Sequence, residues 1–186
     1  TGGEGGQEKY NQELIDRFNH GEMIHADSIH FADSLKYYTL RDHRVVYGGG
    51  GIMPDCFVPL DTTRLTRYHR LLSAKSIIIN AYLKYADANR TALKARYKSF
   101  DAFNRDYAIP QSLLDAIVAE GKKEKVEPKN ETELKTTLPY LSHQLKALVA
   151  RDLWEMNEYF RVWNEQSDIV NKAVELATGS RRPAAF

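Results

Sequence analysis

The chain has 186 residues, of which 42% are hydrophobic and 27% are charged, and these are ordinary proportions for a globular protein. Its formal net charge of +1 gives no broad electrostatic basis for binding nucleic acid or a membrane surface. The single cysteine excludes a disulfide within the chain, and no apolar run approaches the roughly 18 residues that span a bilayer. A chain of this length can bury one good core, or a small subdomain and a larger one.

The first third of the chain predicts a helix followed by a β-hairpin. Apolar residues recur at helical spacing from Glu8 to Asn19, and His20-Gly21 provides a stop. Leu35–Leu40 contains aromatic and β-branched residues that favour a strand, and Arg44–Tyr47 fits the returning strand. The polar residues between these two segments suit the turn of the hairpin.

Four consecutive glycines, Gly48–Gly51, follow the second strand directly. They permit positive φ angles and the close approach of another chain segment, and Pro54-Asp55 then fixes the exit of the run as a turn. A phosphate-binding loop is disfavoured because it needs a helix after the glycines, whereas a predicted short buried strand, Cys56–Val58, follows here. Three strands are few for an independent sheet, so we expect them to be the last strands of a larger one.

From Asp61 onward the composition changes and predicts an all-helical domain. Asp61-Thr62-Thr63 offers N-caps for a first helix. Within it, Ile77-Ile78-Ile79 is apolar on more than one face, which predicts a place at the centre of a core. Ser99 suits the cap of a short helix, and Pro110 suits the first turn of the next.

A long apolar repeat then predicts a helix of about eight turns. Asn130 and Glu133 have the spacing of a capping box at its start, and Pro139 should kink or divide it. A last helix is predicted from about Ser167 to Thr178. The long repeat consists of Leu134, Leu138, Leu141, Leu145, Leu148, Leu153, Met156, Phe160 and Trp163.

Few side chains have the spacing of a metal or catalytic site. His20, His25 and His30 recur every five residues, which does not place them on one helix face, and no set of carboxylates or cysteines matches them. Cys56 lies in an apolar segment without an evident electropositive partner, so we expect a buried structural thiol. We expect no metal site and no cofactor.

The segment from Gly48 to Asp55 resembles the glycine-rich G-I-x-P-D motif near the end of the catalytic domain of carboxyl-terminal processing peptidases, the tail-specific serine proteases. The segments Asp33–Tyr37, Arg44–Tyr47 and Ala150–Phe160 are similar to the branch of that family found in Bacteroidetes-type bacteria. The resemblance covers nearly the whole chain. The motif residues, which the resemblance makes structural or cleft-bordering, are Gly48, Gly49, Gly50, Gly51, Ile52, Pro54 and Asp55.

The resemblance implies a Ser-Lys dyad, in which the lysine activates the serine and backbone amides stabilise the oxyanion. In the family both residues lie upstream of the G-I-x-P-D motif, and neither of their sequence contexts occurs here. Ser73 and Lys98 have a similar separation, but they lack the small flanking residues and we treat the spacing as coincidence. The chain itself is therefore expected to hold no catalytic residue and, alone, no peptidase activity.

These observations predict an α+β fold that is mostly α. Residues 1–60 are interpreted as the end of the peptidase catalytic domain, and residues 61–186 as a helical scaffold or gating domain. By resemblance, the parent enzyme cleaves proteins after engaging their C-terminal tails, carries an upstream PDZ domain and works in the periplasm or cell envelope of a Gram-negative bacterium. The alternative is a non-enzymatic helical module for protein interaction or dimerisation, and the helical domain could also form a homo-oligomer.

Overall fold

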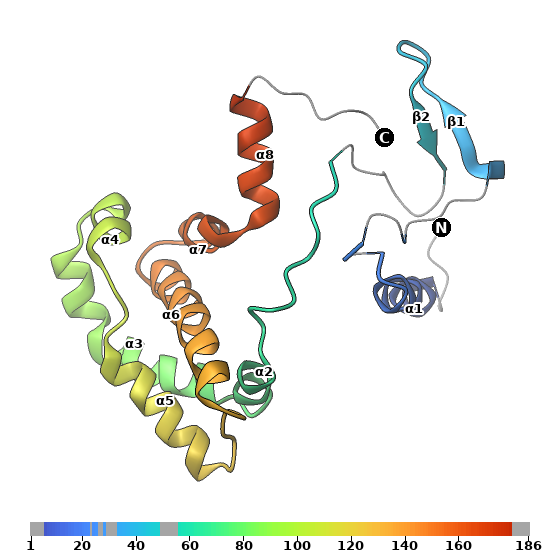
Figure 1. Ribbon diagram of the computed structural model, residues 1–186. Coiled ribbons are helices and arrows are strands. Elements are labelled where there is room, and N and C mark those ends of the chain that lie inside the picture. Colours follow the sequence, from blue (N-terminus) through green and yellow to red (C-terminus); the bar gives the residue numbers. More distant parts are fainter. Residues whose placement is uncertain (1–5, 23, 26–27, 29–32, 49–55, 180–186) are drawn as a thin grey trace. The chain divides into compact units, whose positions relative to one another are not determined.

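The computed structural model describes residues 6–22, 24–25, 28, 33–48 and 56–179. The chain forms two compact units, one made of Thr1–Asp61 with Lys172–Phe186 and the other of Thr62–Asn171. We call the second one the helical unit. Most described residues are helical, and the described residues contain only two short strands, which confirms the predicted mostly-α class (Figure 1).

The first unit contains the predicted helix and hairpin. Helix α1 spans Gly6–Asn19, and a 3-10 turn at Asp33–Leu35 leads into strand β1, Lys36–Tyr38. Strand β2, Val45–Tyr47, returns antiparallel to β1. The predicted strand at Cys56–Val58 is wrong: these residues form no strand and are only half-buried. Their side chains favour a strand, but among the described residues no strand lies beside them whose backbone could pair with theirs.

The helical unit is built from six helices and part of a seventh. Helix α6 packs against α2, α3 and α7, and α3 packs against α2 and α5. The final helix, α8, begins in this unit, and none of its residues is buried. The bounds are α2 Arg67–Ala74, α3 Ile77–Arg96, α4 Phe100–Asp106, α5 Gln111–Lys123, α6 Glu131–Leu153, α7 Met156–Trp163, a 3-10 turn at Asn164–Gln166, and α8 Asp168–Thr178.

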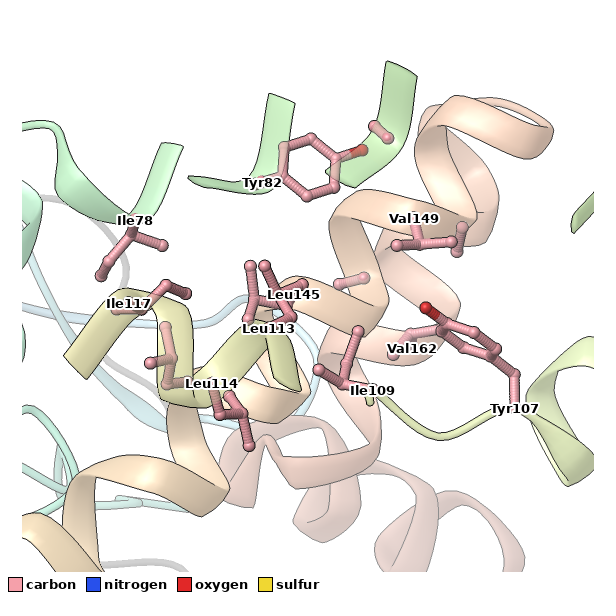
Figure 2. Close-up of a cluster of buried hydrophobic side chains, with 14 of the residues drawn as sticks. Ile78, Tyr82, Tyr107, Ile109, Leu113, Leu114, Ile117, Leu145, Val149 and Val162 are labelled. Atoms are coloured by element: carbon pink, nitrogen blue, oxygen red, sulfur yellow. The ribbon is translucent and has the colours of Figure 1, made fainter. Parts of the chain in front are cut away.

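One apolar core holds helices α2 to α7 together, because each of them contributes buried side chains to it. Ile77 and Ile78 are buried in this core, whereas Ile79 is 38% exposed, so two of the three adjacent isoleucines belong to the core. Trp154 closes one end by packing against the rings of Phe100 and Phe103. Figure 2 shows Ile78, Tyr82, Leu113, Leu114, Ile117, Leu145, Val149 and Val162 converging from several helices.

Side-chain caps fix where several helices begin. The Oγ of Ser99 accepts the N–H of Ala102, as predicted, and the Oδ1 of Asn130 accepts the N–H of Glu133 at 2.8 Å. The Glu133 carboxylate in turn accepts the N–H groups of Lys129 and Tyr68, and these two bonds hold the pKa of Glu133 below its usual value. The start of α6 is thereby tied to the start of α2.

Three helix boundaries differ from those predicted. The first helix begins at the N-cap Thr66 rather than at residues 61–63, and it breaks at Ser76, which adopts a left-handed φ of 58°. Helix α6 continues through Pro139 and ends at Trp154, whose φ and ψ of −127° and −106° are not helical. Pro139 has no N–H to donate to the carbonyl of Lys135, four residues earlier. Lys135 lies on an exposed face of the helix, where water can donate to that carbonyl instead.

Candidate functional site

The β-hairpin is the candidate functional site, because it is the element that precedes the glycine run. The partners across it are Lys36 and Tyr47, Tyr37 and Val46, and Tyr38 and Val45. The N–H of Gly48 donates to the carbonyl of Leu35 at 2.8 Å, and the N–H of Thr39 donates to the carbonyl of Arg44 at 2.9 Å. These two backbone hydrogen bonds lie at the two ends of the paired strands.

Both faces of this hairpin carry large exposed side chains. Alternate residues of a strand point to opposite faces, so Tyr38 and Val45 share one face while Tyr37 and Val46 share the other. Tyr37 and Tyr38 are each 58% exposed, and both valines are exposed as well. A hairpin at the surface normally keeps one face polar, whereas strands covered on both faces are apolar on both. Apart from Lys36, which shares a face with Tyr38, this hairpin carries apolar or aromatic side chains on both faces.

Gly48 is the one residue of the glycine run that the structure describes, since Gly49–Asp55 lies outside the described residues. A Cβ at Gly48 would lie 2.9 Å from Cε2 of Tyr37, so the tyrosine ring rests against the glycine backbone. We expect at least one of the four glycines to have either a positive φ or another backbone packed too closely to admit a Cβ, and Gly48 has neither, since the close atoms belong to the Tyr37 side chain. Gly48 therefore provides room for the Tyr37 ring. The backbone constraint expected of the glycine run remains a prediction for the other three glycines.

The structure describes two of the three regularly spaced histidines and the cysteine, and none of them is buried. Nδ1 of His20 lies 2.6 Å from the carbonyl oxygen of Asp16, and His25 is exposed. His30 lies outside the described residues. No group of three or more metal-ligating side chains gathers anywhere in the described part of the chain. Cys56 is a free, half-buried thiol rather than the buried one predicted, and Lys172 lies near enough that Cys56, after Glu175, helps to raise the pKa of this lysine, so the expectation of no electropositive partner is wrong.

Ser73 and Lys98 do not form a dyad among the described contacts. Ser73 is exposed near the end of α2, and its carbonyl accepts the N–H of Ser76. Lys98 bonds the carbonyl of Lys94 within its own stretch of chain, with 3.5 Å between Nζ and the oxygen. Within the part of the chain that the structure describes, neither residue has the partner that nucleophilic catalysis needs.

Sequence reasoning did not identify two features of the helical unit. His69 is 4% exposed, its Nε2 lies 2.8 Å from Oε1 of Gln144, and its Nδ1 has no hydrogen-bond partner among the described residues. Because Gln144 Oε1 only accepts, Nε2 carries a proton, and burial lowers the pKa of His69 and so favours the neutral ring. No periodicity distinguishes such a residue from a surface histidine.

The second feature is an open groove of about 460 Å³ between α3 and α5. Ala81, Leu113 and Ala116 are among its apolar lining residues, and Lys84 and Glu120 lie among the charged ones. Its charges are of both signs, and Lys75 and Glu124 already pair at 3.5 Å. The groove could not be predicted, because helical periodicity marks the buried stripe of each helix and not the gap between two.

Residues 68–155 match the model of a family of unknown function (DUF8443). No curated protein and no solved structure matches the chain. The matched segment lies within the helical unit, from the second residue of α2 to just past the end of α6, and leaves out the hairpin. In the described part of the chain, no helix has both the length and the apolar character that crossing a membrane requires.

Proposed function

We propose that this chain is the C-terminal portion of a carboxyl-terminal processing serine peptidase and that its hairpin completes the catalytic sheet of the parent enzyme. The observation that carries the proposal is the hairpin with apolar side chains exposed on both faces, placed directly before the glycine motif. A two-stranded hairpin is marginally stable in water, so it needs further strands or a covering layer. The upstream part of a peptidase sheet would supply both.

In this proposal the chain contributes structure rather than chemistry. The parent's serine and lysine would lie upstream, and the hairpin and Gly48 would hold the neighbouring strands in place. The helical unit would serve as a scaffold or a gate beside the cleft. An upstream PDZ domain, protein substrates engaged by their C-terminal tails and a periplasmic setting belong to the same proposal, and all of them rest on the family resemblance.

The test is the activity of the complete gene product. We expect it to degrade unfolded casein and a peptide with a C-terminal tail, and to lose this activity when the serine of its Ser-Ala-Ser-Ala-like segment is replaced by alanine. The 186-residue chain alone should show no turnover. Turnover by the chain alone that disappears in Ser73→Ala would show that this serine, and not an upstream one, is the nucleophile.

Gly48→Ala gives a second and more local test. In the chain alone the Tyr37 ring is exposed and can move aside for the new Cβ, so the melting temperature should change little. In a sheet covered on both faces the ring could not move, and overpacking costs about 1–3 kcal/mol. The complete enzyme should therefore lose stability and activity in Gly48→Ala, and equal tolerance in both proteins would contradict the proposed burial.

One observation favours a helical interaction module as the second candidate function. The family match falls inside the helical unit and excludes the hairpin, as expected for a module that recurs by itself. The two candidates separate when residues 61–186 are produced alone and are also deleted from the complete gene product. A module should fold and self-associate or bind a partner alone, and its loss should spare any peptidase activity.

A further inference from the structure

The hydrogen bonds of the hairpin determine which backbone groups face outward. In an antiparallel pair, residues alternate between bonding the partner strand and pointing away from it. The bonds from Gly48 to Leu35 and from Thr39 to Arg44 place Tyr37 in the inward set. The N–H and C=O groups of Lys36 and Tyr38 therefore point to the outer edge of β1, where they have no partner among the described residues.

We propose that this outer edge of β1 pairs with the same edge of a second copy of the chain, forming a four-stranded antiparallel sheet. The register follows from the spacing of the outward groups. If Lys36 of one copy faces Tyr38 of the other, both outward residues of each strand are used, and four N–H···O=C bonds form about a two-fold axis at Tyr37. A register centred on Lys36 or on Tyr38 would pair only one outward residue of each strand.

The side chains favour the same register. Lys36 lies opposite the Tyr38 ring of the other copy, where an ammonium–aromatic contact can form, instead of opposite another lysine. On the other face the two Tyr37 rings meet across a non-hydrogen-bonded pair, where side chains approach most closely. Pairing would thus bring together the exposed tyrosines of both copies and extend a marginal hairpin to four strands.

This inference does not depend on the proposed peptidase function. A strand of a larger sheet and a second copy would compete for one edge, so the dimer is expected of the 186-residue chain by itself. Failure to dimerise would leave the activity tests of the complete gene product unaffected. Conversely, a complete gene product without peptidase activity would leave the dimer in place.

The experiment measures the mass of the chain by sedimentation equilibrium over a range of concentrations. We expect a monomer–dimer equilibrium that Tyr38→Pro weakens at least ten-fold, because proline removes an outward N–H without breaking a bond inside the hairpin. Val45→Pro is the matched control: Val45 is the cross-strand partner of Tyr38 and its N–H points to the outer edge of β2 instead. It should dimerise as the unmodified chain does.

A cross-linking variant covers the case in which proline disturbs the hairpin. In a Cys56→Ser background, Tyr37→Cys should form a disulfide between two copies, since the two Cα atoms would be about 4.5 Å apart. Val46→Cys, on the same face of β2, should not cross-link. A chain that stays monomeric overturns the proposal. So does a dimer that is unaffected by Tyr38→Pro and not captured by the Tyr37→Cys variant, because it would form through another surface.

Discussion

Two adjacent isoleucines provide a sharp test of the helical core. Ile78 is 3% exposed and Ile79 is 38% exposed on the same helix, α3. Ile78→Ala removes three buried carbons at about 0.8 kcal/mol each and leaves a cavity, so the unfolding free energy should fall by about 3–4 kcal/mol. Ile79→Ala removes the same atoms from a site open to water and should cost about 1 kcal/mol.

The chain has two tryptophans, Trp154 and Trp163, and both lie in the helical unit, so their fluorescence reports the unfolding of that unit by urea. With a denaturant slope of about 1.5 kcal/mol per molar, Ile78→Ala should lower the midpoint by about 2 M and Ile79→Ala by less than about 1 M. Equal shifts at the two positions, or a larger one at Ile79, would refute the position of α3 on the core.

Three further predictions concern the same unit. Gly121→Ala should lower the unfolding free energy by about 1–2 kcal/mol despite alanine's helix propensity, because the added Cβ would lie 2.9 Å from Leu72 Cδ2 and 3.0 Å from Val126 O. Lys125→Gly should raise it by about 1 kcal/mol, since residue 125 directly follows the C-cap of α5 and has a φ of 57°. The unfolding free energy should also fall as the pH drops below about 6.5, the pKa of an unfolded histidine, because the folded His69 has a lowered pKa and resists the proton that the unfolded chain binds. His69→Gln should remove that part of the fall.

Each of these predictions has a contradicting result in the same urea titration. A neutral Gly121→Ala would mean that the contact between α5 and α2 is looser than the distances indicate. A destabilising Lys125→Gly would mean that the lysine side chain stabilises the end of α5 more than its strained φ costs. Parallel pH profiles for the unmodified chain and His69→Gln would mean that the folded ring accepts its proton freely.

The sequence predicted those elements whose causes are local. Turn residues and β-branched residues define the hairpin, and the caps at Ser99 and Asn130 bond the backbone within three residues. Helix α8, Asp168–Thr178, also lies where the sequence predicted a last helix. The capping bonds join residues three apart, and the hairpin bonds join two strands on either side of one short turn.

Predictions that depended on distant partners were less successful. The break at Trp154 rather than Pro139 follows from the packing of the indole against Phe100 and Phe103, which lie far earlier in the chain. Residues 56–58 have strand-forming side chains but no strand beside them among the described residues. The pKa of His69 is lowered because tertiary packing, including the edge-on contact with Tyr140 of α6, buries the ring, and the bond to Gln144 opposes this shift only in part. Neither hydrophobic periodicity nor local motifs identify such partners.

The most direct test of the central claim is to read the coding sequence immediately upstream of Thr1. The proposed relation to carboxyl-terminal processing peptidases predicts an open reading frame that encodes a Ser-Ala-Ser-Ala-like segment and, about two dozen residues later, a lysine in a Gly-Lys-Gly context. An upstream frame without both segments, or one closed by a stop codon, would contradict the claim that this hairpin completes a peptidase sheet.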